Sequence, residues 1–74
     1  MNNTLTGTFN PTLLIKLRVA RGWSAQKAAT EIGLTTQGLL NLELGKATPR
    51  ADTLASIARV YGVKMDDFYA ARSR

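Results

Sequence analysis

Few residues of this 74-residue chain could do covalent or metal chemistry. The sequence contains no histidine and no cysteine, so it lacks the usual zinc ligands, Cys–His nucleophiles and histidine general bases. Its five carboxylates form no recognisable catalytic motif, and Asp66 and Asp67 are better placed to begin a helix. We therefore expect a protein that is not an enzyme and that uses no cofactor and no metal.

The side chains best suited to recognition are carboxamides and cations. Gln37 and Asn41 each carry a donor beside an acceptor, a pair that matches N6 and N7 on the edge of adenine. Lys46 and Arg50 follow, and their charges could contact phosphate or could simply be solvated. The formal charge of +5 favours a polyanionic partner, nucleic acid first and an anionic membrane second. Most of this excess lies in residues 1–50, which hold six basic and two acidic groups.

The elements that position these groups are predicted to be short helices, because no segment alternates with the period of a strand. We expect an all-α fold with helices that begin at Pro11, Ala25, Thr36, near Leu54, and at Met65. Asn10, Ser24 and Thr35 are placed to cap the first three helices. Glycines at 22, 33, 45 and 62 end the first four, and the fifth covers "MDDFYAA", residues 65–71. Phe9 could pack onto Leu14, and Trp23 is predicted to pack in the core.

The length permits one small domain, which we place at residues 9–71. Residues 1–8 are expected to be a flexible N-terminal arm and residues 72–74 a basic C-terminal tail. The start, "MNNTLTGTFN", has no basic segment followed by an apolar block, so it does not read as a signal peptide. No apolar run is long enough to span a membrane. A cytoplasmic location is expected.

The spacing of residues 25–42 predicts two helices that cross steeply through a tight turn. Such a crossing needs a small residue where the helices touch, here Ala29, and a residue tolerant of left-handed geometry at the turn, here Gly33. It also needs apolar residues to bury, and these stand at positions 28, 32, 34, 39 and 42. The pattern is that of a helix-turn-helix.

Three longer stretches extend this pattern. The segments "LIKLRVARGWS", "NLELGKATP" and "LASIARVYGVKMDDF" resemble the Cro and repressor type of helix-turn-helix, the lambda-repressor-like or XRE family, over about residues 13–69. The resemblance implies a compact five-helix DNA-binding domain. It also implies a bacterial or phage transcription regulator that binds near-palindromic duplex DNA as a homodimer, rather than a membrane, with the helix at 36–44 in the major groove.

Site residues follow from the resemblance position by position. Base-edge contacts would fall on four residues of the third helix, namely Thr36, Gln37, Leu40 and Asn41. Phosphate contacts would fall around it, on Gln26, Lys46, Thr48 and Arg50. Ala25 departs from the glutamine usual in the family, and Gly38, Leu40 and Leu44 depart from its pattern of base-reading residues. Arg18 and Glu43 match a buried ion pair of the family, although they could also be two exposed charges.

Two alternatives remain open. Met65, Phe68 and Tyr69 could close the core or could meet a second copy of the chain. The function favoured by the resemblance is a dimeric repressor of the Cro, phage-repressor or controller-protein type. The other reading is a protein-interaction module or antitoxin-like subunit on the same scaffold, in which Leu40 and Leu44 form an apolar docking stripe for a protein partner.

Overall fold

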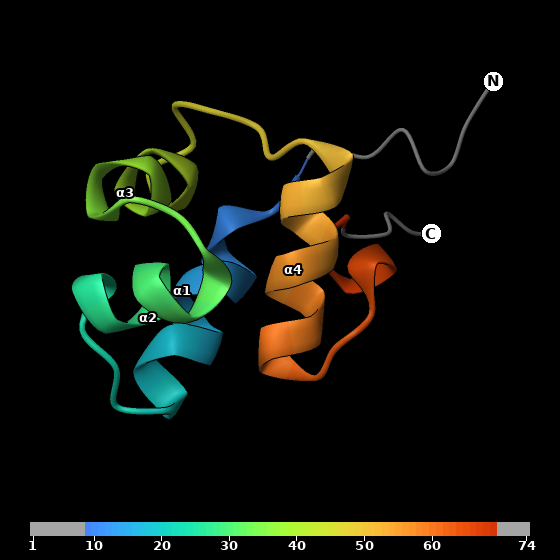
Figure 1. The fold of residues 1–74 in the computed structure, drawn as a ribbon. Coiled ribbons are helices and arrows are strands. Elements are labelled where there is room, and N and C mark those ends of the chain that lie inside the picture. Colours follow the sequence, from blue (N-terminus) through green and yellow to red (C-terminus); the bar gives the residue numbers. More distant parts are fainter. Residues whose placement is uncertain (1–8, 70–74) are drawn as a thin grey trace, which may run out of the picture.

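A computed structural model describes residues 9–69 of the chain (Figure 1). It contains α1 (Pro11–Ala20), α2 (Ala25–Ile32), α3 (Thr36–Glu43), α4 (Ala51–Tyr61) and a short 3-10 helix, η2 (Met65–Phe68). Within residues 9–69 the extended pairing is a single isolated bridge between Phe9 and Tyr69. The predicted arm at residues 1–8, the tail at 72–74, and residues 70 and 71 of the predicted domain lie outside the described residues.

The first three α-helices begin where their capping residues predict. Asn10 Oδ1 accepts a hydrogen bond from the backbone N–H of Thr12 at 3.0 Å. Ser24 Oγ accepts one from Lys27 at 3.0 Å, and Thr35 Oγ1 accepts one from Gly38 at 2.9 Å. These oxygens satisfy N–H groups that a helix leaves unpaired at its start, so local sequence favours these three boundaries.

The prediction for the fifth helix is wrong in its length and its type. It is a four-residue 3-10 helix, and Tyr69 after it is extended, with φ −113° and ψ 93°. The Asp67 carboxylate accepts a hydrogen bond from the Lys64 backbone N–H at 3.1 Å, which closes a tight turn. Phe68 is fully buried, and Tyr69 turns away to pair with Phe9. Tertiary packing of these aromatic residues therefore overrides the continuation of the helix.

Phe9 is joined mainly to the far end of the chain. Its ring stacks on Phe68 with centroids 5.7 Å apart, and it meets Tyr69 edge-on at 6.2 Å. The Asn10 backbone N–H also donates to the Phe68 carbonyl. Phe9 and Leu14 both belong to the core. The prediction that Phe9 packs onto Leu14 did not include Phe68 and Tyr69, the distant residues that bury Phe9.

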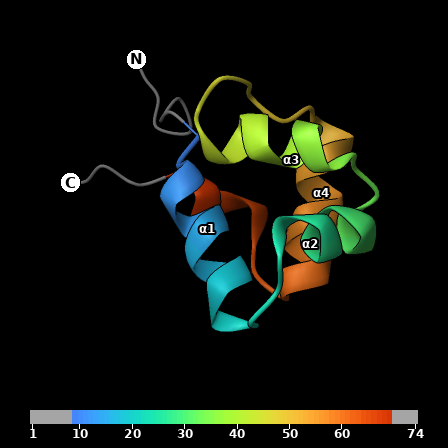
Figure 2. The ribbon, with the colours of Figure 1, turned by 90° about the vertical axis from the view of Figure 1, so that its left-hand side faces the viewer.

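The helices surround one core. Figure 2 looks onto α2 and α3, with α4 behind them and α1 at one side. The inward residues predicted for the two motif helices are buried, except that Leu34 is only partly buried. The core consists of Phe9, Leu14, Ala28, Ala29, Ile32, Leu39, Leu42, Leu54, Ile57, Tyr61 and Phe68. No helix within residues 9–69 has both the length and the apolar character needed to cross a bilayer.

Trp23 lies at the edge of this core and is half-buried. Its ring packs against Tyr61, with centroids 5.8 Å apart. The Arg21 guanidinium lies 5.4 Å and the Lys27 ammonium 5.8 Å from the centre of the indole. The prediction that Trp23 packs in the core is therefore right for the part of the indole that contacts Tyr61. The outer part of the indole is covered by the cations of Arg21 and Lys27.

Candidate functional site

The turn between α2 and α3 has the geometry that the sequence predicts. Gly33 has a φ of 95°, in the left-handed region that glycine adopts without strain. The backbone N–H groups of Gly33 and Leu34 both donate to the Ala29 carbonyl at 2.8 Å. Ala29 is 1 % exposed, so its small side chain allows the helices to approach closely. This turn sets the direction of α3 relative to α2.

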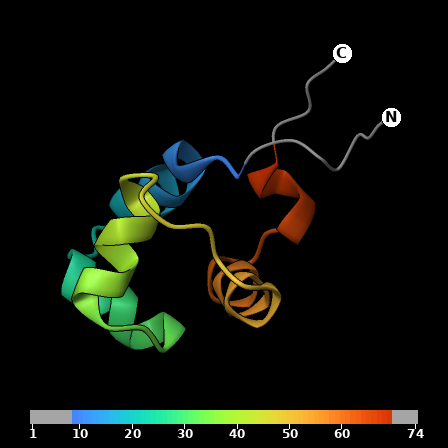
Figure 3. The same ribbon diagram turned by 90° about the horizontal axis from the view of Figure 1, so that it is seen from above.

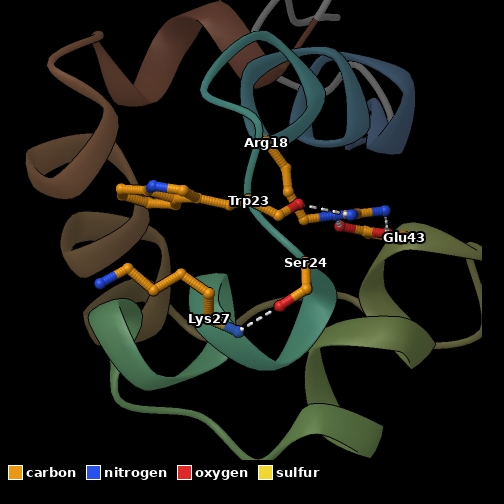
Figure 4. A network of polar contacts seen from close by, with 5 residues as sticks. All are labelled: Arg18, Trp23, Ser24, Lys27 and Glu43. Atoms are coloured by element: carbon orange, nitrogen blue, oxygen red, sulfur yellow. Dashed lines mark hydrogen bonds and ion pairs between the residues drawn. The ribbon is translucent and has the colours of Figure 1, made fainter.

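A buried ion pair attaches the end of α3 to α1 (Figure 4). Arg18 Nε lies 2.7 Å from Glu43 Oε2, and Arg18 Nη2 lies 3.1 Å from Glu43 Oε1, so the contact is bidentate. Arg18 Nη1 also donates to the Trp23 carbonyl at 3.0 Å. The side chains are 18 % and 5 % exposed, and the hydrogen bond to Glu43 raises the pKa of Arg18. One guanidinium thus links α1, the loop before α2 and the last turn of α3.

Tyr61 is a buried, uncharged residue near this ion pair. Burial raises the pKa of its hydroxyl, and the negative charge of Glu43 raises it further. The hydroxyl is buried, and within the described residues it has no hydrogen-bond partner. Tyr61 therefore stays uncharged at neutral pH, and its role is to pack.

The opposite side of α3 presents the four residues predicted to contact bases. Thr36 and Gln37 are exposed and Leu40 and Asn41 are half-buried, whereas the inward residues Leu39, Leu42 and Glu43 are 0 %, 5 % and 6 % exposed. Helical spacing places positions 36, 37, 40 and 41 on one face. The structure therefore gathers this predicted set on a single accessible surface.

Two features of α3 are absent from the sequence-based site. Gln37 Nε2 donates a hydrogen bond to Asn41 Oδ1 at 3.0 Å, one helical turn away. Gly38 donates its backbone N–H to the capping Thr35 oxygen, and a Cβ added to Gly38 would lie 3.0 Å from that oxygen. A side chain at this position would lie close to the capping oxygen, although α2 makes the equivalent cap to a lysine, Lys27. The signals for both were present in the sequence, as carboxamides four residues apart and a glycine three residues after a threonine.

The position of Lys46 is fixed by the way α3 ends. Gly45 is left-handed, with a φ of 77°, and its N–H donates to the Leu42 carbonyl at 3.2 Å. The Lys46 N–H donates to the Asn41 carbonyl at 2.9 Å, which completes a Schellman motif. The Lys46 side chain is exposed directly beyond the helix.

The remaining predicted phosphate contacts lie on separate elements. Gln26 is exposed in the first turn of α2, Thr48 is exposed in the loop after α3, and Arg50 directly precedes α4. Figure 3 shows this loop running from α3 across to the start of α4. The Arg50 side chain is 86 % exposed, and its 3.8 Å contact with Asp52 is in solvent, where such pairs contribute little. Arg50 therefore remains free to meet another charge.

The predicted dimer residues are not equally accessible. Phe68 is 0 % exposed, so of its two predicted alternatives, core or dimer contact, the structure supports the core. The reason is the stacking of Phe68 on Phe9. Met65 is 37 % exposed and Tyr69 is half-buried. Both line a shallow hollow of about 300 Å³ between the start of α4 and η2, with Pro49, Ala51, Leu54 and Asp66.

The fold and this site define a helix-turn-helix protein, and comparison with known proteins agrees. Residues 14–68 match the family model described as "Helix-turn-helix", and the chain belongs to that family. It is 40 % identical over 53 residues to the "SPbeta prophage-derived uncharacterized HTH-type transcriptional regulator YonR" of Bacillus subtilis (strain 168). It is 32 % identical over 57 residues to the "HTH-type transcriptional regulator PuuR" of Escherichia coli (strain K12) and of Shigella flexneri.

These relatives are longer than the matched segment. The alignment with YonR covers 72 % of this chain and 49 % of that protein. The alignments with the two PuuR proteins cover 77 % of this chain and 31 % of each. The chain therefore spans about half, or less, of the curated relatives it matches.

Proposed function

We propose that this chain is a sequence-specific duplex-DNA-binding transcription regulator that reads the major groove with α3 and has no catalytic role. The observation that carries the proposal is the accessible polar face of α3, anchored from behind by the buried Arg18–Glu43 pair. Membership of the helix-turn-helix family and the names of the relatives support it.

In this proposal the contacts divide into two kinds. Thr36, Gln37, Leu40 and Asn41 meet base edges and supply sequence preference. The exposed groups around α3 (Gln26, Lys46, Thr48 and Arg50) meet phosphates and set the depth and orientation of the helix in the groove. The anchored end of α3 keeps the first set in a fixed position relative to the second.

We further propose that the protein acts as a dimeric repressor of the Cro, phage-repressor or controller-protein type. A two-fold dimer would place its recognition helices about 34 Å apart, one turn of DNA, and would need a near-palindromic site. Met65 and Tyr69, which line the hollow beside α4, are the remaining predicted contacts between copies.

Selection from a random duplex pool tests this function directly. We expect enriched sequences with two similar half-sites in inverted orientation, and sedimentation of two chains per selected duplex. A pool that shows no enrichment at low salt would refute sequence-specific binding. Enrichment of single half-sites, bound by one chain, would refute the dimer alone.

Binding is expected to weaken steeply with salt. Each phosphate neutralised should contribute roughly −0.9 to the slope of log K against log salt. Replacing Lys46 with alanine should weaken binding to all duplexes about equally and make the slope shallower by about one. Lys64, an exposed lysine between α4 and η2, is the matched control, and Lys64→Ala should leave the slope unchanged. A Lys46 variant with altered sequence preference but an unchanged slope would contradict the phosphate assignment.

A second candidate function rests on the exposed leucines. Leu44 is 65 % exposed and Leu40 is half-buried, which would suit an apolar docking stripe on an antitoxin-like or other protein-interaction module. The absence of duplex binding at low salt would favour this function over the first. In the DNA-binding function, Leu44 lies beyond the base-reading residues and meets the backbone or a neighbouring protein.

Leu40 is expected to read a thymine methyl group. A leucine cannot hydrogen-bond a base, but it can pack on this methyl, which thymine presents in the major groove. Replacing that thymine with uracil should weaken binding by an amount on the order of 1 kcal/mol. Leu40→Ala should largely abolish the difference between thymine and uracil, whereas Leu44→Ala should preserve it. If uracil at every half-site position leaves affinity unchanged, Leu40 does not read DNA.

A further inference from the structure

The two carboxamides on the exposed face of α3 form a hydrogen-bonded unit with a defined direction. Gln37 Nε2 donates one of its two hydrogens to Asn41 Oδ1 at 3.0 Å. When the donated hydrogen is the one that points away from the amide oxygen, that oxygen and the second N–H remain free and side by side at one edge of the Gln37 amide. In this contact the Gln37 nitrogen lies toward Asn41, so the hydrogen bond favours one of the two orientations of the Gln37 amide.

The free edge of Gln37 matches one base. The Gln37 oxygen can accept from adenine N6, while its second N–H donates to adenine N7. The same orientation would set the Gln37 oxygen against the acceptor O6 of guanine, and a reversed amide would set that oxygen against the acceptor N7 of either purine. The direction of the bond to Asn41 therefore favours adenine.

We propose that Asn41 is a positioning residue, which orients the Gln37 amide so that Gln37 reads adenine. This inference rests on the proposed DNA-binding function and deepens it. It changes the role of Asn41 from an independent base contact to a support for its neighbour. Asn41 suits this role because it is half-buried, whereas Gln37, one helical turn away, is exposed.

We expect the hydrogen bond from Gln37 to Asn41 to affect DNA binding more than it affects the stability of the fold. A Gln–Asn pair one turn apart on a solvated helix contributes little to stability, because water competes for both amides. In a groove from which water is excluded, the same hydrogen bond is stronger, and a misdirected amide leaves polar groups of the base unpaired. Loss of the Asn41 acceptor should therefore change base discrimination while leaving the unfolding midpoint close to that of the wild type.

The test measures discrimination as a ratio of dissociation constants. The base pair read by Gln37 is first located as the position whose preference is lost in Gln37→Ala. Affinity is then compared for adenine and for purine, which lacks the N6 amino group, at that position. For the wild type we expect the adenine duplex to bind roughly 5- to 100-fold more tightly.

Two variants of Asn41 separate positioning from direct contact. Asn41→Ala removes the acceptor, and the ratio should fall toward that of Gln37→Ala. Asn41→Asp keeps an oxygen that accepts from Gln37 but loses the amide donors, so the ratio should be retained. The added negative charge weakens binding to both duplexes alike and cancels in the ratio. Thermal unfolding of each variant accompanies the binding measurement.

Three results would overturn the inference. In the first, Asn41→Ala retains the wild-type ratio, so that Asn41 does not orient Gln37. In the second, Asn41→Asp loses the ratio as completely as Asn41→Ala does, so that the donors of Asn41 make the contact. In the third, guanine rather than adenine is preferred opposite Gln37. All three presuppose selective duplex binding by the wild type, whose absence would instead refute the proposed function.

Discussion

Replacing Glu43 with alanine is expected to lower the free energy of unfolding by about 3–5 kcal/mol, because it leaves a largely buried cation without its partner. Arg18 would lose both bonds of the bidentate contact and keep only the Trp23 carbonyl. Its side chain is only 18 % exposed, so water compensates poorly for the lost carboxylate. Urea unfolding followed by circular dichroism measures the change.

Glu31 provides the matched control for this substitution. Its carboxylate lies 3.0 Å from Lys27 Nζ, but these side chains are 42 % and 53 % exposed. Glu31→Ala should therefore cost no more than about 1 kcal/mol, the usual range for an exposed pair. If Glu43→Ala proves no more destabilising than Glu31→Ala, the ion pair at the end of α3 does not anchor the helix.

Leu39→Ala is expected to destabilise the domain by about 2–5 kcal/mol. Leu39 is 0 % exposed and belongs to the single core, so truncation removes buried methyl groups and leaves a cavity. Small domains have only a few kcal/mol of net stability. We therefore expect a large fall in the unfolding midpoint, or loss of the folded state at room temperature.

Leu44→Ala is the matched control for Leu39→Ala, because it truncates an exposed leucine instead of a buried one. Leu44 directly follows α3 and is 65 % exposed, so its truncation should change stability by less than about 0.5 kcal/mol. Equal effects of the two substitutions would show that α3 does not bury the face that carries Leu39. The leucines near α3 thus serve different purposes, since those facing inward stabilise the fold and those facing outward are available to a partner.

The parts of the fold that were predicted correctly are those that local sequence controls. The caps at Asn10, Ser24 and Thr35 act on N–H groups two or three residues away. The left-handed turn at Gly33 likewise depends on a single residue. Helical periodicity then assigns each apolar residue to a face, so the amino-acid pattern is enough to place Leu39 and Leu42 inside.

The parts that were missed depend on residues far apart in the chain. The stacking of Phe9 on Phe68 and the bridge from Phe9 to Tyr69 shorten the last helix and bury Phe68, yet neither has a signal in the neighbouring sequence. Trp23 is covered partly by Arg21 and Lys27, which pattern alone places as solvated cations. Tertiary contacts of this kind override local preference.

The candidate site was predictable in its location but not in its internal contacts. Spacing and family resemblance placed Thr36, Gln37, Leu40 and Asn41 on one face, and the structure has them on an accessible surface. Their roles toward DNA stay predictions. The hydrogen bond from Gln37 to Asn41 depends on rotamers that both side chains adopt together, which spacing permits but does not require.

The bridge between Phe9 and Tyr69 has a consequence for how such a unit can be built into larger proteins. Because these two residues pair, the polypeptide enters and leaves the domain at neighbouring points. In Figure 3 the η2 end lies across the molecule from α3. Other domains fused before or after this one would therefore be attached to it at neighbouring points. We therefore expect that the domain can be inserted into a host protein with short linkers, because its two ends lie close together.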